Sequence, residues 1–354
     1  MIKLSILFIL SFSILATDKS LTLSNEFLSI IVNNQDTNTG RFGIQTTGGN
    51  PTRQTDDNQT LLLSRPYPWS SYTTLLLDGT PIILGGPATK RAGQHHPTGV
   101  VTQQRLYDDR IETTTVYNRI HTTQTLRFVR NPATLVKDLA LISYTITNTD
   151  THAHQIGTRV MLDTWLGSND AAPFRVGELA IQSEKALPGT YSDYWQTFDS
   201  LKQPTVIAQG LLRNSPLSIE PPDRMRFVNW GTVADYPWDF DYIPERSFIR
   251  SGESEPDTAI ALYWDPISVA PGETRTIRTA YGLGGVSLSP GSLSVGLAAP
   301  AAHYSTDANP ITITAYIQNS GGFDSRNTKA TLILPDSLER VSGSLTLDLG
   351  TLYV

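Results

Sequence analysis

The first candidate site is a segment in which acidic, basic and amide side chains lie close together. It reads RVMLDTWLGSNDAAPFR and spans residues 159–175. Asp163, Asn169 and Asp170 could supply oxygen ligands to Ca²⁺, although their spacing matches no calcium-binding loop of fixed length. Asp163 and Trp165 could instead bind a sugar, because a tryptophan ring packs on its apolar face while a carboxylate accepts hydrogen bonds from its hydroxyls. With a partner elsewhere in the chain, Asp163 could also act as a general acid or base.

A structural role is the interpretation that we favour for the same segment. A strand predicted over residues 160–166 places Asp163 on the same face as Arg159, because alternate residues of a strand share a face. The asparagine and the aspartate that follow are turn-forming residues, and arginine forms strong hydrogen bonds with carboxylates. The sequence therefore predicts a structural brace formed by Arg159, Asp163, Asn169, Asp170 and Arg175. No metal or other cofactor is predicted for it, and a bound Ca²⁺ is the alternative.

The second candidate site interleaves aromatic rings with carboxylates. Residues 229–246 read NWGTVADYPWDFDYIPER, and this composition suits a carbohydrate, whose apolar face stacks on rings while its hydroxyls bond to carboxylates. The alternative is that the rings fill one end of a β-sandwich core. Over both segments, the residues predicted to bind a ligand are Asp163, Trp165, Trp230, Tyr236, Trp238, Asp239, Asp241 and Tyr242.

Standard catalytic motifs are absent from the sequence. It has no G-x-S-x-G, no H-E-x-x-H and no P-loop motif. It also has no cysteine, which excludes thiol catalysis and cysteine-ligated metal sites. No catalytic residue is therefore predicted, and the sequence favours a non-enzymatic protein.

The elements that must position these residues are predicted to be β-strands. Apolar and polar residues alternate in residues 110–117, 123–129 and 139–150, as in strands with one buried face. Residues 139–150 and the strand after them are predicted to form one hairpin. The two strands that flank the APGE turn in residues 258–284 are predicted to form another. The sequence therefore predicts an all-β fold.

Composition favours an extracellular β-protein and argues against nucleic acid as a partner. Only 17% of the 354 residues are charged, and the net charge is −6 at pH 7. Phosphate binding requires clustered lysine and arginine, and the sequence contains no such cluster. Hydrophobic residues make up 39% of the chain, which is enough to bury a core, and the length allows two domains.

The chain is predicted to contain four segments. Residues 1–16 combine one lysine with an apolar run too short to span a membrane, which is typical of a secretory signal peptide. A large β-sandwich domain is expected over residues 17–287, and a linker rich in Ser, Gly, Ala and Pro over residues 288–309. Residues 310–354 are interpreted as part of an immunoglobulin-like domain, truncated because such a domain needs roughly 100 residues.

The expected location follows from these segments. The protein is predicted to be exported, to a bacterial cell surface or beyond it, with no membrane span once the signal has been removed. Further C-terminal modules are expected in the full-length protein.

The large domain resembles a known group in three segments, SYTITNTD, RVMLDTWLGSNDAAPFR and APGETRTIRTAYGLG. The group consists of uncharacterised secreted bacterial β-proteins similar to the galactose-mutarotase-like proteins. The resemblance implies a large two-sheet antiparallel sandwich, a supersandwich, that often handles carbohydrate. Mutarotase-like enzymes use a histidine acid and a glutamate base on facing strands, and no pair in this sequence matches their motifs.

The C-terminal region resembles immunoglobulin-like modules of bacterial surface proteins, of the CARDB and DUF11 type. The resemblance rests on the segments ITITAYIQNSGG, ATLILPDSLERVSG and LDLGTL. It implies a spacer or adhesion module without chemistry of its own.

Together these features predict an exported, non-catalytic β-sandwich module that binds a glycan or a surface protein. A carbohydrate-active enzyme of the lyase or epimerase-like type is one alternative. A purely structural stalk element is the other.

Overall fold

The computed structural model describes residues 19–51, 54–132, 134–284, 293–300, 309–319 and 325–353. The chain forms two compact units, Met1–Gly285 and Val286–Val354. The predicted signal peptide, residues 1–16, lies outside the described residues. Among those residues, no helix has the length and apolar character needed to cross a membrane.

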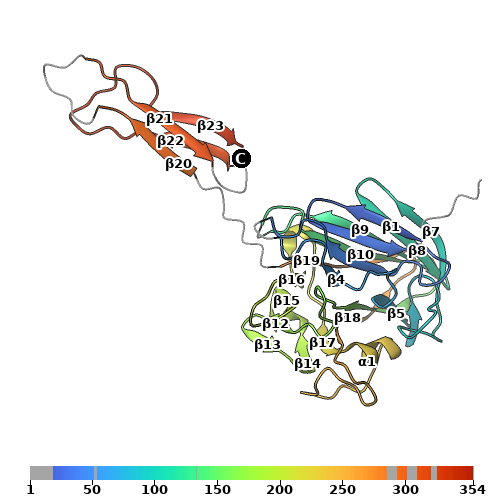
Figure 1. Ribbon diagram of the computed structural model, residues 1–354. Helices are drawn as coiled ribbons and strands as arrows, with labels where there is room; N and C mark the ends of the chain where they lie inside the picture. Colours follow the sequence, from blue (N-terminus) through green and yellow to red (C-terminus); the bar gives the residue numbers. More distant parts are fainter. Residues whose placement is uncertain are drawn as a thin grey trace, which may run out of the picture. The chain divides into compact units, whose positions relative to one another are not determined.

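The large unit is built from three antiparallel sheets (Figure 1). The largest has nine strands, in the order β13 (Leu179–Ile181), β12 (Phe174–Val176), β15 (Tyr194–Phe198), β16 (Ile207–Leu211), β19 (Thr274–Leu283), β10 (Leu139–Asn148), β9 (Ile120–Val129), β8 (Arg110–Tyr117) and β7 (Val100–Leu106). The second has six, in the order β14 (Lys185–Pro188), β17 (Arg224–Asn229), β18 (Thr258–Val269), β11 (His154–Asp163), β5 (Tyr72–Leu77) and β6 (Thr80–Ile83). The third has four, in the order β1 (Ser20–Ser24), β2 (Leu28–Asn33), β3 (Phe42–Thr46) and β4 (Thr60–Leu62).

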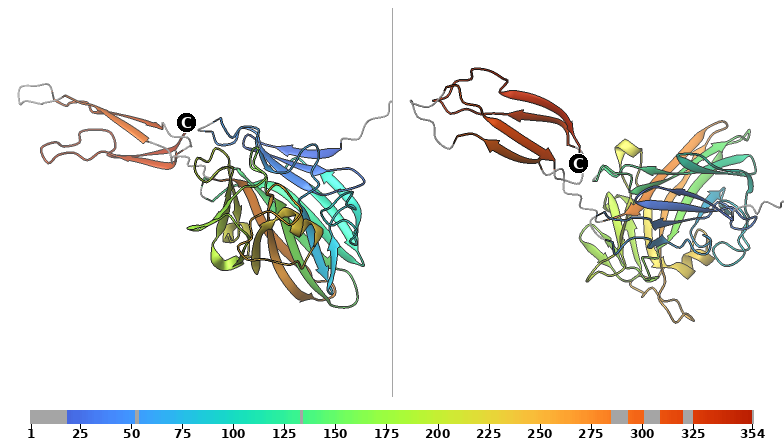
Figure 2. Two further views of the ribbon diagram at one scale, coloured as in Figure 1. Left: turned by 60° about the horizontal axis from the view of Figure 1, so that its bottom comes forward. Right: turned by 45° about the horizontal axis from the view of Figure 1, so that its top comes forward.

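The nine-stranded and six-stranded sheets face each other as two layers (Figures 1 and 2). Aromatic side chains meet between them. The ring of Phe227 on β17 lies 4.9 Å from that of Phe174 on β12 and 6.4 Å from that of Trp195 on β15, measured between ring centroids. The predicted all-β class and the large antiparallel sandwich are therefore confirmed.

Burial follows the residue patterns that predicted the strands. β8 alternates between buried and partly exposed positions, because only one of its faces packs on the core. The first six residues of β10 and the first seven of β18 are all buried. These central strands are covered on both faces, which is why their sequences are continuously apolar or small there.

The two predicted hairpins are wrong. β10 pairs with β9 and β19, whereas the next strand, β11, pairs with β5 and β18 in the other large sheet. β18 and β19, which flank the APGE turn, likewise belong to different sheets. Alternation identifies the buried face of a strand but not its partner, so a short turn between two facing sheets resembles a hairpin turn in sequence.

The region between β13 and β18 holds the short elements that the sequence analysis did not resolve. Besides short strands it contains the 3-10 helices η1 (Gly189–Tyr191) and η2 (Ser215–Leu217) and one α-helix, α1 (Trp230–Asp235). Asn229 starts this helix, since its side-chain oxygen accepts a hydrogen bond from the backbone N–H of Thr232. The helix is short, and its first five residues are buried.

The described residues of the small unit form two two-stranded antiparallel sheets. β20 (Leu293–Ala298) pairs with β21 (Thr314–Asn319), and β22 (Ser325–Thr331) pairs with β23 (Thr346–Leu352). The predicted linker over residues 288–309 therefore contains a strand, β20. Its serine, glycine and alanine gave it the composition of a linker and obscured the alternation of leucine and valine. The immunoglobulin-like assignment stays a prediction.

Candidate functional site

Three aspartates from separate parts of the chain meet at one end of the β11–β18 pair. Asp163 is the last residue of β11 and pairs with Ala259 of β18. Asp257 directly precedes β18, and Asp170 lies in the loop after β11. Because the two strands are antiparallel, the end of β11 lies beside the start of β18, which places the three carboxyl groups together.

The loop that carries Asp170 is held by hydrogen bonds. Leu166 and Asn169 exchange backbone hydrogen bonds of 2.9 Å. The Asn169 side chain accepts a hydrogen bond from the N–H of Ala171 and donates one of 2.8 Å to the carbonyl of Asp199. The carbonyl of Asp170 accepts a 3.0 Å hydrogen bond from the N–H of Thr258. The loop is therefore fixed both to β18 and to the residue after β15.

The geometry of this carboxylate cluster, Asp163, Asp170 and Asp257, matches that of ligands to one cation. One oxygen atom from each carboxyl group lies within 4.8 Å of the other two. Oxygen ligands lie about 2.3–2.6 Å from a bound Ca²⁺, so two ligands of the same ion can be up to about 5 Å apart. All three aspartates can thus contact a single ion.

Two of the cluster's oxygen atoms are buried without a hydrogen-bond partner. Asp163 is only 4% exposed, and neither its Oδ1 nor the Oδ1 of Asp257 has a partner among the described residues. The hydroxyl of Ser70 is buried beside Asp163 and is also without a partner at hydrogen-bond geometry. Buried polar atoms are almost always paired in folded proteins, so this concentration of unpaired oxygen calls for a ligand.

Burial and mutual repulsion favour the protonated forms of these carboxyl groups. Desolvation raises the pKa of Asp163 well above its ordinary value, the charge of Asp170 adds to the rise, and the Ser70 hydroxyl opposes it. Burial likewise raises the pKa of Asp257, with further contributions from the other two cluster carboxylates. Burial raises the pKa of Asp170 to about 6. Without a bound cation, the cluster therefore retains protons at neutral pH.

Asn169 caps the turn as predicted, but the arginine contacts of the predicted brace do not form. Arg159 is fully buried, but it donates hydrogen bonds to the hydroxyl of Tyr72 at 2.7 Å and to the carbonyls of Tyr236 and Val233 at 2.6 and 3.1 Å. It shares a strand face with Asp163, yet the two are four residues apart, a distance of about 13 Å along a strand.

Arg175, the other predicted partner, also lies away from the cluster. Its side chain is exposed, donates to the carbonyl of Gly177 and forms an ion pair of 3.0 Å with Glu178. Within the described part of the chain, Asp163 has no ion pair with any basic residue.

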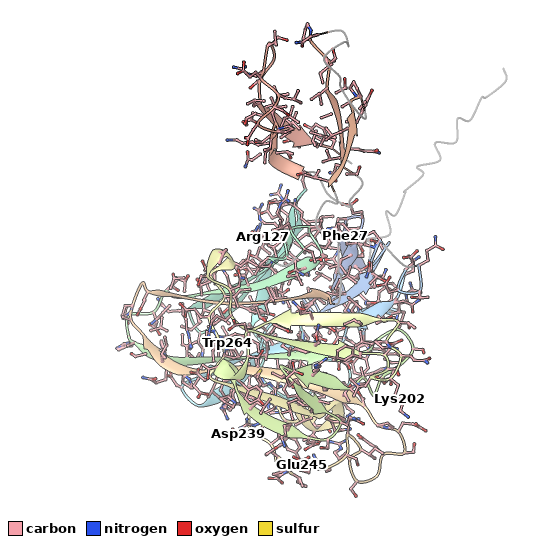
Figure 3. All side chains as sticks on the ribbon, turned by 90° about the vertical axis from the view of Figure 1, so that its left-hand side faces the viewer. Phe27, Arg127, Lys202, Asp239, Glu245 and Trp264 are labelled. Carbon is pink, nitrogen blue, oxygen red and sulfur yellow. The ribbon has the colours of Figure 1, made fainter. Side chains whose placement is uncertain are left out.

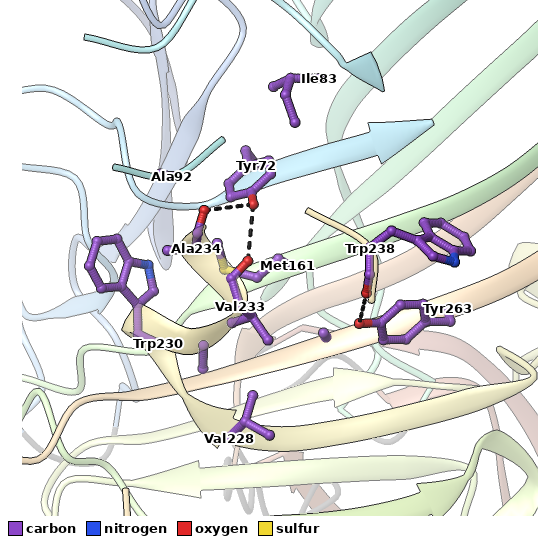
Figure 4. Packing of buried hydrophobic residues seen from close by; sticks show 12 residues of the cluster. Tyr72, Ile83, Ala92, Met161, Val228, Trp230, Val233, Ala234, Trp238 and Tyr263 are labelled. Carbon is purple, nitrogen blue, oxygen red and sulfur yellow. Dashed lines mark hydrogen bonds between the residues drawn. The ribbon is translucent and has the colours of Figure 1, made fainter. Parts of the chain in front are cut away.

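The predicted sugar-binding tryptophans belong to the core. Trp230 and Trp238 are each 6% exposed and pack in one cluster with Tyr72, Met161 and Tyr263 (Figure 4). The ring of Trp238 meets that of Tyr263 edge-on at 5.4 Å, and the Tyr263 hydroxyl donates to the Trp238 carbonyl. Neither tryptophan ring is free to stack on a sugar, so these rings fill the sandwich core instead.

The other predicted ligand-binding residues lie apart from the carboxylate cluster. Tyr236, Asp239 and Asp241 are exposed, and Figure 3 shows Asp239 at the margin of the large unit. Tyr242 is partly buried under the guanidinium of Arg226, 5.5 Å from its ring centroid. Trp165 is partly buried. Of the residues predicted to bind a ligand, only Asp163 belongs to the cluster.

Asp257 is the functional candidate that sequence reasoning missed. It precedes a clear strand pattern, TAIALYW, and that boundary position was visible in the sequence. Grouping it with Asp163 requires the knowledge that β11 and β18 are neighbours. The prediction paired both strands with other segments, so the signal could not be used.

A surface cleft borders the cluster. Its volume is about 360 Å³, and it is lined by Ala171, Pro173, Gln182, Ser247, Phe248, Ile249 and Pro256. Ala171 directly follows Asp170, and Pro256 directly precedes Asp257. The backbone N–H of Asp257 also donates to the carbonyl of Phe248. Two lining residues of the cleft are therefore chain neighbours of cluster residues, although no cluster residue lines it.

Comparisons with known proteins support no assignment to a family. No family model matches the chain, and no curated protein matches it. Among solved structures, it is similar to a galactose mutarotase-like protein from Lactobacillus casei, with 8% identity and a TM-score of 0.42 over 75% of this chain and 100% of that one. It is also similar to a galactose mutarotase related enzyme from Lactobacillus acidophilus, with 9% identity and a TM-score of 0.41 over 75% of this chain and 98% of that one. Similarity at this level assigns the chain no activity.

Proposed function

We propose that the large unit is a non-catalytic binding module built around a divalent-cation site, with Ca²⁺ as the ion and Asp163, Asp170 and Asp257 as its ligands. The observation that carries this proposal is the pair of buried, unpartnered carboxylate oxygens, Asp163 Oδ1 and Asp257 Oδ1, within one three-carboxylate cluster.

The chemistry of the ligands favours calcium. They are all oxygen atoms, which are preferred by Ca²⁺, Mg²⁺ and Mn²⁺ rather than by zinc or copper. Calcium also tolerates irregular geometry and ligands drawn from loops, whereas Mg²⁺ demands a near-ideal octahedron. A divalent cation would neutralise most of the charge of three ionised carboxylates.

Neighbouring arginines do not neutralise the negative charge of the three carboxylates as a bound cation would. Arg91 lowers the pKa of Asp257 slightly against the effect of burial. Its guanidinium, however, is bonded to Asp235 at 2.8 Å and lies 3.4 Å from Glu253. Arg250 pairs with the same two acidic residues. These two cations are thus already committed to a neighbouring ion-pair network.

Calorimetric titration of the full chain, first stripped with EDTA, tests the cation site. We expect one Ca²⁺ per chain, with an affinity up to the millimolar range of extracellular calcium modules. Asp257→Asn should abolish the binding heat because it removes one charged ligand. Asp239→Asn, which changes an exposed aspartate outside the cluster, should leave it intact. Absence of binding in the unmodified chain, or equal binding by both variants, would overturn the proposal.

The ligand class that we propose for the module is a glycan or a surface protein, bound at the cleft beside the cation. The cleft offers the apolar surfaces of Pro173 and Ile249 together with the polar side chains of Gln182 and Ser247, a combination typical of small-ligand sites. We further propose export, because residues 1–16 have the composition of a secretory signal.

Binding and export can be measured separately. A glycan array probed with the full chain should give signals that disappear in EDTA and with Asp257→Asn. Mass spectrometry of the protein from its native cells should show an N-terminus close to residue 17. An intact leader on protein that stays inside the cell would contradict export without affecting the cation site.

A second function is favoured by the titration of the cluster. At neutral pH a protonated Asp163 beside a largely ionised Asp170 forms an acid–base pair, as required in a lyase or epimerase-like enzyme. Such an enzyme would be active in EDTA and would be inhibited by calcium. The proposed binding module should instead lose its ligand binding in EDTA and require calcium for it.

A further inference from the structure

A second unusual site lies deep in the large unit, where its three sheets meet. Arg41, just before β3, is 1% exposed. One of its guanidinium nitrogens, Nη1, donates to the carbonyl of Trp69 at 2.7 Å. The other two, Nε and Nη2, have no hydrogen-bond partner among the described residues. A buried guanidinium with two unpaired N–H groups is costly.

The guanidinium lines a small cavity. The cavity volume is about 10 Å³, close to the minimum that holds one water molecule or one monatomic ion. The polar side chains that line it are those of Arg41, Tyr72, Thr73, Thr113, Thr115, Thr122 and Gln124. No carboxylate lines it.

The threonines around this cavity present hydrogen-bond donors. The hydroxyl of Thr115 accepts a hydrogen bond from the N–H of Gly85 at 3.1 Å, and that of Thr113 accepts one from the Gln104 side chain at 3.2 Å. Since both oxygens already accept, their protons are available to donate. Thr122 Oγ1 is buried and unpartnered. The cavity is therefore rich in donors.

A second buried cation, outside the cavity lining, contacts the same tyrosine ring as Arg41. The guanidinium carbons of Arg41 and Arg159 lie 5.0 and 5.2 Å from the centroid of the same Tyr72 ring. Neither arginine forms an ion pair within the described part of the chain. Burial raises the pKa of Tyr72, so its phenol stays neutral. Burial lowers the pKa of Arg41 only to about 10, so the arginine is charged at neutral pH.

We propose that this cavity binds one monatomic anion, chloride, between the Arg41 guanidinium and the hydroxyls of Thr113, Thr115 and Thr122. Chloride only accepts hydrogen bonds, which suits the unpaired N–H groups of Arg41 and the threonine hydroxyls that can donate to it. It also supplies the negative charge that two buried guanidinium groups require. A water molecule would fill the same space but would leave both charges uncompensated.

The test is the thermal stability of the full chain as a function of chloride, with gluconate as the replacing anion at constant ionic strength. We expect a saturable rise in Tm with chloride and with bromide. Thr122→Val, a near-isosteric change suited to a strand, should raise the midpoint chloride concentration about tenfold because it removes one hydrogen bond to the ion. Thr114→Val is the matched control, since Thr114 lies on β8 but bonds to Thr123 at 3.0 Å outside the cavity.

Two results would overturn the chloride site. One is an identical Tm in chloride and gluconate. The other is a chloride midpoint that is the same in Thr122→Val as in the unmodified chain. Crystals grown in bromide provide a second measurement that needs no variant. An anomalous peak beside Arg41 is expected there, and density for water alone would contradict the assignment.

Discussion

Asp163 is a buried carboxyl group, and no arginine in the described part of the chain forms an ion pair with it. Strand alternation correctly placed it on the same face as Arg159, but a shared face does not give proximity. The arginine lies four residues away and satisfies carbonyl groups near α1. Besides the Ser70 hydroxyl, the groups that approach the Asp163 carboxyl are the carboxyls of Asp170 and Asp257. At the scale of the residue, the site is therefore defined by like charges.

This arrangement predicts an unusual pH dependence for the cation-free protein. The pKa values of all three cluster carboxyls are raised in the folded state. The folded state then binds more protons than the unfolded state above about pH 4, so the free energy of unfolding falls as pH rises. The contribution is fully present below the ordinary aspartate pKa and is lost as pH rises through the folded-state values. We expect a loss on the order of 2 kcal/mol between about pH 5 and pH 8.

Chemical denaturation in EDTA across this pH range measures the effect. Calcium should remove most of the loss, because it favours the ionised carboxylates. Asp163→Asn should flatten the profile even in EDTA, whereas Asp239→Asn should not change its slope. Equal profiles in EDTA and in calcium would show that the cluster does not bind the ion.

At the scale of elements, the site depends on the antiparallel pairing of β11 with β18. This pairing sets Asp163 opposite Ala259, two residues from Asp257. The sequence predicted both strands but paired each with a strand of the opposite sheet. Hydrophobic patterning indicates which face of a strand is buried, but it does not indicate which strands pair with it. Asp163 and Asp170, two of the three cluster residues, were therefore recognisable in the sequence, whereas Asp257, whose place depends on the strand pairing, was not.

The loop between β11 and β12 supplies the remaining ligand, so its rigidity should control affinity. Asn169→Ala removes the hydrogen bonds to Asp199 and Ala171. We expect a loss of about 1 kcal/mol in the free energy of unfolding and a roughly tenfold weaker calcium affinity, both measured on the full chain by denaturation and calorimetry.

The control for this variant is Asn214→Ala. Asn214 caps η2 by accepting a hydrogen bond from Leu217 and belongs to a turn without a cluster residue. It should lose similar stability but keep its calcium affinity. Equal calcium affinity in both variants would show that the loop does not position Asp170.

At the scale of the whole molecule, composition and periodicity were sufficient for the all-β class, and the resemblance to galactose-mutarotase-like proteins predicted the large sandwich. Composition and periodicity left two interpretations open for the run of aromatic and acidic residues in 229–246, a sugar site and the filled end of a sandwich core. Trp230 and Trp238 are core residues around α1 (Figure 4), and Asp239 and Asp241 are exposed. A sugar site and the end of a sandwich both need aromatic rings next to polar residues, so residue types alone cannot separate them.

The large unit also holds charge in two places where a monomeric β-sandwich core would be expected to be neutral. One is the carboxylate cluster at the end of β11, and the other is the pair of guanidinium groups around Tyr72. Neither site is neutralised by an opposite charge from the described residues. A bound cation would neutralise the carboxylate cluster, and a bound anion would neutralise the guanidinium pair.

The most direct test of the cation site is long-wavelength X-ray diffraction from crystals of the full chain grown in calcium. The account predicts an anomalous peak bound to one oxygen each of Asp163, Asp170 and Asp257, at about 2.3–2.6 Å. The contradicting result is a cluster without a peak, in calcium well above the millimolar range, whose carboxyl groups are hydrogen-bonded to one another through shared protons.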